Sequence, residues 1–336
     1  MSLDPERSAA LTGAKLRALV GAHLQRDVDP DAVVTRAGGA GVVVDDEGWY
    51  LPLEDSARTL GPALTWADAE GCRHAHLLSD DAGNAAALAR RAAEFASTPT
   101  VWTVDERTLV PAVPAPSPTD TVPAPSTAEF VLMLESAGVD VVVEHGVVTG
   151  EVDGLEIARV LVDDQGAATI EVGVGRHDRE AFAMIHGERP VPEALAEVAA
   201  TVARHRSRGA EGHPLNRLAP SRRLRTRVLA DPALAGATVL VPVPPALPRD
   251  DLREDVPAAA LGETDDGEPV VVVCSVGIDL DLVPEAADVR ATRSPAARLR
   301  LLVPARDAHE RTRRLAAALG DPAEVLTVHD DWPHTT

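Results

Sequence analysis

A proline-rich stretch at residues 110–126, VPAVPAPSPTDTVPAPS, interrupts regular structure about a third of the way along the chain. It holds six prolines, and proline has no backbone N–H to donate to a helix or a sheet. Because such a segment favours an extended conformation, it is typical of a linker between folded parts. A chain of 336 residues has room for two domains of ordinary size. We therefore expect an N-terminal domain at residues 1–110, a linker at 111–127 and a C-terminal domain at 128–336.

The composition is globular but poor in aromatic residues. Hydrophobic residues make up 45% of the chain and aromatic residues only 2%, so the core must be built mainly from Ala, Val and Leu. A formal net charge of −21 disfavours extensive contact with a polyanion. Cys72 and Cys274 lie outside any zinc-ligand spacing. Because the chain has no signal-peptide pattern and no apolar run of membrane-spanning length, we expect a cytoplasmic protein with no membrane partner.

Hydrophobic periodicity predicts helices and strands on both sides of the linker. Leu16, Leu19, Val20 and Leu24 recur at helical spacing, and valine-rich runs indicate strands. This order predicts an α/β protein with mixed sheets. The expected helices cover residues 8–24, 84–96, 127–138, 192–206 and 308–319, and the expected strands cover residues 31–36, 41–53, 74–78, 100–105, 139–145, 151–162, 168–174, 238–243, 269–275, 299–304 and 324–328.

The two ends of the chain are similar to each other. VVVDDEGWYLPL at residues 42–53 aligns with VVVCSVGIDLDL at 271–282, an offset of 229. Later pieces, such as VWTV at 101–104 and VLTV at 325–328, align at offsets near 224. The order of predicted elements is also kept, so we expect an internal duplication of an α/β half-domain. The alternative is convergence between two stretches that are both rich in Ala, Val and Leu.

Two carboxylates in GEVDGLEIARVLVDDQGAATIEVGVGRHD, residues 150–178, lie on what the pattern predicts to be adjacent strands of a hairpin. These are Asp153 and Glu171. Acidic oxygens that converge on one hard cation are what a metal-dependent phosphodiesterase needs. Each acid also has an ordinary interpretation, because Asp-Gly is a common turn and Glu171 alternates with apolar neighbours as an exposed strand residue does.

Residues 128–174 resemble the core of the PD-(D/E)xK, or restriction-endonuclease-like, superfamily. The order of helix, strand, strand, turn and strand is similar, as is the local pattern of acids. The resemblance implies a mixed-sheet fold in which Asp153 and Glu171 bind Mg²⁺. Glu135, or alternatively Glu129, would be the supporting acid on the preceding helix.

The sequence departs from that family at one position. Gly173 stands where the resemblance implies a lysine, and Arg176 and His177 follow shortly after it. Arginine stays protonated near neutral pH, so Arg176 could stabilise negative charge but could not act as a base. His177 could supply an ionisable group. We therefore take Asp153, Glu171, Arg176 and His177 as the candidate catalytic residues.

An arginine-rich segment follows at residues 204–227 and reverses the charge of its surroundings. It holds eight arginines and a single acid. Such a segment could bind phosphate groups through bidentate contacts, or its arginines could pair with the many acids of the chain. The candidate anion-binding residues are Arg204, Arg206, Arg208, Arg217, Arg222, Arg223 and Arg225.

Two functions follow from these patterns. The first is a divergent nuclease-like protein that binds, or with Mg²⁺ cleaves, nucleic acid or another phosphate-bearing ligand. The second is a non-catalytic scaffold or adaptor that binds a protein partner. The acidic hairpin and the arginines favour the first function, whereas Gly173, the net charge and the few aromatic residues favour the second.

Overall fold

The computed structural model describes residues 4–36, 38–119, 121–175, 191–207, 213–246 and 256–329, which form two compact units. Unit 1 comprises Met1–Ser117, Ile278–Ala291 and His309–Glu324. Unit 2 comprises Pro118–Gly277, Thr292–Ala308 and Val325–Thr336. The first boundary thus falls inside the expected linker at 111–127, and two later segments return to unit 1.

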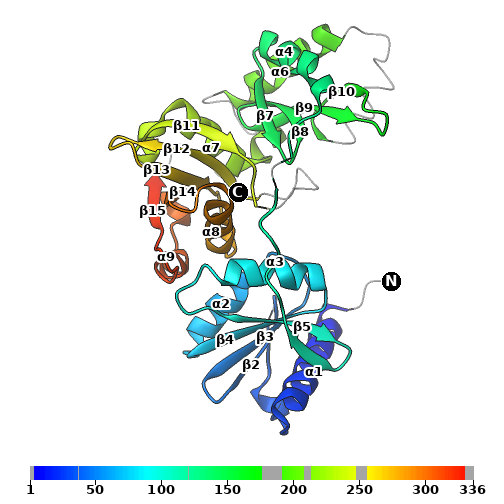
Figure 1. Cartoon of the computed structure of the whole chain (residues 1–336), viewed down its shortest axis with the longest axis vertical. Helices are drawn as coiled ribbons and strands as arrows, with labels where there is room; N and C mark the ends of the chain where they lie inside the picture. The colour runs from blue at the N-terminus through cyan, green and yellow to red at the C-terminus, as the bar shows by residue number, and fades with distance from the viewer. Residues whose placement is uncertain are drawn as a thin grey trace. The chain divides into compact units, whose positions relative to one another are not determined.

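A six-stranded mixed sheet forms the centre of unit 1 (Figure 1). β3, β4 and β5 are parallel, and the pairs β1–β2, β2–β3 and β5–β6 are antiparallel. The strands follow one another across the sheet in chain order: β1 (Val34–Arg36), β2 (Gly39–Val44), β3 (Glu47–Pro52), β4 (His74–Ser79), β5 (Thr100–Asp105) and β6 (Thr108–Pro111).

Helices cover both faces of this sheet. Asp4 caps α1 (Pro5–Leu24), and Leu16, Leu19 and Val20 of α1 are buried against one face, as their spacing predicts. α2 (Leu60–Ala69) and α3 (Ala82–Ala92) pack against β3, β4 and β5. Unit 1 also contains α8 (Leu282–Arg293) as far as Ala291, and α9 (Glu310–Ala317).

The described residues of unit 2 form two sheets. The first is antiparallel, with the order β10 (Ala168–Val172), β9 (Leu155–Val162), β8 (Val147–Val152) and β7 (Asp140–Glu144). The second is mixed, with the order β11 (Ala237–Val243), β12 (Ala258–Thr264), β13 (Pro269–Cys274), β14 (Arg298–Pro304) and β15 (Glu324–Val328).

Each sheet of unit 2 has its own helices and its own core. Leu134 of α4 (Ala128–Ser136) and Leu195 of α6 (Val191–Arg206) are buried on the antiparallel sheet. Leu224 and Val228 of α7 (Pro220–Ala230) are buried on the mixed sheet. Among the described residues, no helix is both long and apolar enough to cross a membrane.

The α/β class predicted from the sequence is confirmed, with two mixed sheets and one antiparallel sheet in the described residues. Two predicted strands are wrong: residues 41–53 form most of β2, a turn and β3, and residues 151–162 form the end of β8, a turn and β9. The helices α2, α7 and α8, the strands β6 and β12 and most of β8 were not predicted. In both mixed sheets an antiparallel hairpin, β2–β3 or β12–β13, is followed by a parallel neighbour.

Candidate functional site

Asp153 lies in the two-residue turn between β8 and β9. Asp153 and Gly154 both have positive φ, 48° and 75°, as the tight turn of a hairpin requires. A Cβ at position 154 would stand 2.4 Å from the backbone nitrogen of Arg223, so this turn also approaches α7 closely. The ordinary interpretation of Asp-Gly as a turn is therefore confirmed, and the backbone places the carboxylate of Asp153 beside arginines.

Two arginines hold the carboxylate of Asp153. Nε of Arg223 donates to its Oδ2 at 2.7 Å, and Nε of Arg206 lies 3.7 Å from the same oxygen. Arg206 also donates from Nε to the backbone carbonyl of Asp153 at 3.1 Å. Burial raises the pKa of the Asp153 carboxyl above its ordinary value, and the positive charges of Arg223 and Arg206 oppose that rise.

The strand register does not bring Glu171 to Asp153. Glu171 is exposed on β10 and lies opposite Arg159 of β9, whereas Asp153 comes before Leu155, the first residue of β9. Leu155 and Arg159 are four residues apart, a separation of about 13 Å along a strand. Two ligands of one cation lie within about 5 Å of each other, because each oxygen is about 2.0–2.6 Å from the metal. These two carboxylates therefore do not form a shared cation site.

The other predicted members of that site do not complete it. Glu135 is exposed near the end of α4, and Arg176 and His177 lie outside the described residues. In the part of the chain that the structure describes, no group of three or more His, Cys, Asp or Glu side chains could hold a metal ion.

Most of the described candidate anion-binding arginines bind acids and carbonyls of the chain itself. Arg222 and Arg225 of α7 are buried and each contacts both Glu144 of β7 and Glu151 of β8. Nη1 of Arg225 lies 3.0 Å from Glu144, and Nη2 lies 3.1 Å from Glu151. The nearby carboxylates raise the pKa of Arg222 further above its ordinary value, although burial opposes them.

The remaining candidate arginines divide into one buried residue, two exposed ones and one that is not described. Arg206 donates from Nη1 to the carbonyls of Leu215 at 2.7 Å and Leu218 at 3.0 Å. Burial lowers the pKa of Arg206 to about 10, which still leaves it charged at neutral pH. Arg204 and Arg217 are exposed, and Arg208 lies outside the described residues.

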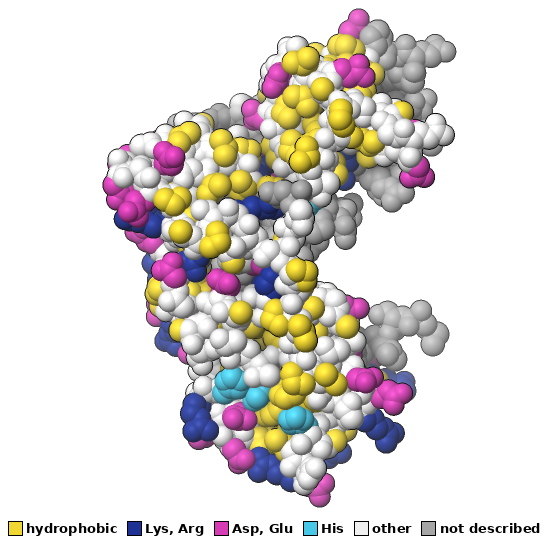
Figure 2. Space-filling view, viewed as in Figure 1, with side chains coloured by type: hydrophobic (Ala, Val, Ile, Leu, Met, Phe, Trp, Pro, Cys, Tyr) yellow, Lys and Arg dark blue, Asp and Glu magenta, His cyan; other side chains and the backbone are white. Residues whose placement is uncertain are grey.

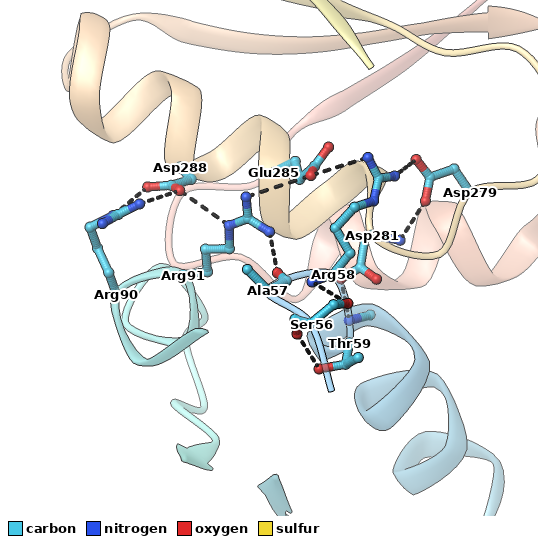
Figure 3. Close-up of polar contacts among 11 residues, drawn as sticks. Ser56, Ala57, Arg58, Thr59, Arg90, Arg91, Asp279, Asp281, Glu285 and Asp288 are labelled. Atoms are coloured by element: carbon cyan, nitrogen blue, oxygen red, sulfur yellow. Dashed lines mark hydrogen bonds and ion pairs between the residues drawn. The ribbon is translucent and has the colours of Figure 1, made fainter. Parts of the chain in front are cut away.

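Unit 1 contains a second buried group of charges, which the sequence did not predict (Figure 3). Arg90 and Arg91 at the end of α3 face Asp288 of α8, and both of their Nε atoms donate to its carboxylate, at 2.8 and 3.1 Å. Arg58 lies 3.3 Å from Glu285, one turn earlier on α8. The i, i+3 spacing of Glu285 and Asp288 puts both acids on the face of α8 that meets these arginines.

The loop that precedes α8 adds two more acids to this group. Asp279 accepts a hydrogen bond from Nη2 of Arg58 at 2.6 Å, and Asp281 accepts one from the backbone N–H of Gly61 at 3.0 Å. Burial raises the pKa of Asp281 to about 6 and that of Glu285 to about 7. The four acids at 279, 281, 285 and 288 are the sequence feature that could have indicated this group. No pattern in the sequence identifies the arginines that pair with them.

Figure 2 shows histidine side chains beside hydrophobic side chains on one face of unit 1. Within unit 1 the rings of His76, Trp49 and Trp102 lie together. His76 stacks on Trp49 with ring centroids 3.8 Å apart. Nε1 of Trp102 donates to Nδ1 of His76 at 3.1 Å, so in the neutral ring the proton is on Nε2, which faces Glu47 at 3.2 Å. Burial lowers the pKa of His76 to about 4, which keeps the ring neutral at pH 7.

Comparison with known proteins adds no relative: no protein-family model matches the chain, and no significant similarity was found among curated proteins or solved structures.

Proposed function

We propose that the protein is a non-catalytic scaffold or adaptor that binds a basic protein partner through its acidic surface. One observation carries the proposal: the charged residues that a phosphodiesterase would use pair with one another inside unit 2. Arg222, Arg225 and Asp153 are the main participants. Their charges stabilise contacts between α7 and the β7–β8–β9 hairpins. Because each arginine is already paired with a carboxylate, little positive charge remains to bind an external phosphate.

Mg²⁺ does not fit the residues expected to bind it. The carboxylate of Asp153 is held by two guanidinium groups, and Glu171 is several residues away along the sheet. A cation at Asp153 would have to displace Arg223 and would leave that half-buried arginine without its carboxylate, which is unfavourable.

We further infer that the chain arose by duplication of an α/β half-domain. The shared strand order of the two mixed sheets supports this, and it matches β13 with β3. The sequence alignment at an offset of 229, which puts β13 on β2, is therefore wrong. Two hydrogen bonds in unit 1 also support the duplication: Ala96 N–H donates to the carbonyl of Ala318, and Gly320 N–H donates to that of Glu94. These two bonds are related by the duplication: Ala318 stands 224 positions after Glu94, and Gly320 stands 224 positions after Ala96. The later pieces of the sequence align at the same offset. Alignments of orthologous sequences that match the halves in another register would contradict the duplication.

Calorimetry with Mg²⁺ and Mn²⁺ tests the absence of a metal-dependent site. We expect no saturable heat for the wild type, for Asp153→Ala or for the control Glu193→Ala, an exposed acid of α6. Metal binding that Asp153→Ala abolishes and Glu193→Ala preserves would support the nuclease function instead. Cleavage of a labelled DNA duplex by the wild type would do the same.

Fluorescence anisotropy tests whether the protein binds a basic partner. A labelled lysine- and arginine-rich peptide should bind at low ionic strength and dissociate as salt is added, because exposed charges are screened. A peptide of the same length with glutamate and aspartate in place of the basic residues should not bind. Equal binding of both peptides, or of neither, would contradict recognition through the acidic surface.

A further inference from the structure

Unit 1 contains a small pocket between the β1–β3 edge of its sheet and α2. The pocket has a volume of about 180 Å³ and is lined by Tyr50, Trp66 and Pro62 among others. Since one water takes about 30 Å³ of liquid volume, a compact molecule of roughly six to ten non-hydrogen atoms would fill it. Gly41 also lines the pocket, and a Cβ there would stand 2.4 Å from Cε2 of Trp66. The benzo ring of Trp66 therefore packs closely against this strand at the pocket wall.

Two buried polar atoms at this pocket have no hydrogen-bond partner among the described residues. They are Nε1 of Trp66 and Oγ1 of Thr65, whose residues are 9% and 7% exposed. Buried polar groups are nearly always hydrogen-bonded, so we take these two atoms as the candidate donors to a ligand. An indole N–H can only donate, and hence the ligand must offer an acceptor.

The charged residues that line the pocket are both arginines, in a chain that is strongly negative overall. Arg36 and Arg311 line it, and no Asp or Glu does so among the described residues. Arg36 is exposed and lies 3.3 Å from Glu70, and Arg311 is exposed on α9. Burial raises the pKa of the Tyr50 phenol, which therefore stays protonated and can also donate.

We propose that this pocket binds a small organic carboxylate. Its apolar part would lie against Tyr50 and Pro62, and its oxygens would accept hydrogen bonds from the indole N–H of Trp66, the hydroxyl of Thr65 and the guanidinium of Arg311. This donor set fits a planar anion better than a neutral amide, because arginine and carboxylate form charge-assisted bonds.

The test uses benzoate as the probe and the indole N–H signals of the full chain, labelled with ¹⁵N-tryptophan. Benzoate should shift the signal of Trp66, identified with Trp66→Phe. The signal of Trp102 should stay in place, because its N–H already donates to His76. Benzamide, which has the same shape without the charge, should bind at least tenfold more weakly. An unmoved Trp66 signal at millimolar benzoate, or equal binding of benzamide, would overturn the proposal.

Variants test which side chains contact the bound benzoate. Arg311→Gln should raise the Kd for benzoate about tenfold, the loss expected for one charge-assisted contact. Arg314→Gln is the matched control, because Arg314 lies on the same helix but pairs with Asp68 and does not line the pocket. Thr65→Val keeps the shape and should weaken benzoate severalfold. Equal effects of the two arginine variants, or no effect of Thr65→Val, would contradict the site.

Discussion

Replacing Arg225 with methionine should strongly destabilise unit 2. Arg225 is 1% exposed, and its two Nη atoms lie 3.0 Å from a Glu144 oxygen and 3.1 Å from a Glu151 oxygen. Methionine is a flexible, unbranched side chain that can occupy much of the same space. The substitution therefore removes the charge with little loss of packing and leaves Arg222 as the remaining described arginine between two carboxylates.

The magnitude follows from opposing contributions. Each pair of opposite charges about 4 Å apart attracts by about 4 kcal/mol at an effective dielectric constant of about 20. Removing Arg225 breaks two such pairs, but it also removes the desolvation penalty of the guanidinium, which is several kcal/mol. Breaking a buried pair on one side costs about 3–5 kcal/mol net, and we expect the free energy of unfolding to fall by that amount.

Urea denaturation at pH 7, followed by circular dichroism, measures this change. Arg204→Met is the matched control: Arg204 is exposed, so its loss should change stability by less than about 1 kcal/mol. Glu151→Gln alone and combined with Arg225→Met completes a double-mutant cycle, with an expected coupling of about 0.5–3 kcal/mol. If Arg225→Met is no more destabilising than Arg204→Met, the buried pairs do not hold α7 to the antiparallel sheet.

Three further predictions concern the stability of unit 1 and the titration of its buried groups. Burial raises the pKa of Glu285 to about 7, so the protonated carboxyl favours the folded state. This contribution is fully present below about pH 4.5 and is lost as the pH rises through 7. The difference in unfolding free energy between wild type and Glu285→Gln should therefore fall by about 3 kcal/mol over this range, and a difference that stays constant with pH would contradict the raised pKa. NMR titration should place the midpoint of His76 near 4, and a midpoint near 6.5 would refute the burial argument. Gly41→Ala should destabilise by about 1–3 kcal/mol, because its Cβ would overlap Trp66. Gly320→Ala, whose Cβ would make only an ordinary contact at 3.5 Å, is the control for thermal unfolding, and equal losses would contradict the overlap.

Local patterns predicted the elements that have one apolar face. The helix α1 was found because Leu16, Leu19 and Val20 recur at helical spacing and pack on a single face. The hairpin β9–β10 was found because its apolar residues alternate and a polar turn separates them. In these cases the sequence spacing and the buried surface follow the same period.

The helix α8 could not be found in this way, because it has no exposed face over most of its length. Every residue from Leu282 to Arg290 is buried, including Glu285 and Asp288, so the sequence has no amphipathic period there. Charged residues at such positions are buried only because Arg58, Arg90 and Arg91 neutralise them. Those partners are far away in the sequence, and local spacing contains no information about them.

The separation of Asp153 from Glu171 is hidden from the local pattern for a related reason. Asp153 and Glu171 were placed on neighbouring strands, although Asp153 is a turn residue with positive φ. The Asp-Gly pair was itself the signal for a hairpin turn. The pairing of Arg222 and Arg225 with Glu144 and Glu151 depends on how α7 packs, which sequence spacing alone does not specify.

Arg91 of α3 meets Asp288 of α8, 197 positions later in the chain. The ribosome synthesises the chain from its N-terminus at about 5–20 residues per second, so α3 is made well before Asp288. During this interval the guanidinium has no acidic partner from α8, although α3 can already pack against β4 and β5. A nascent chain that ends at Ser117 therefore lacks the acids of α8, and unit 1 is complete only after the later segments of the chain have been made.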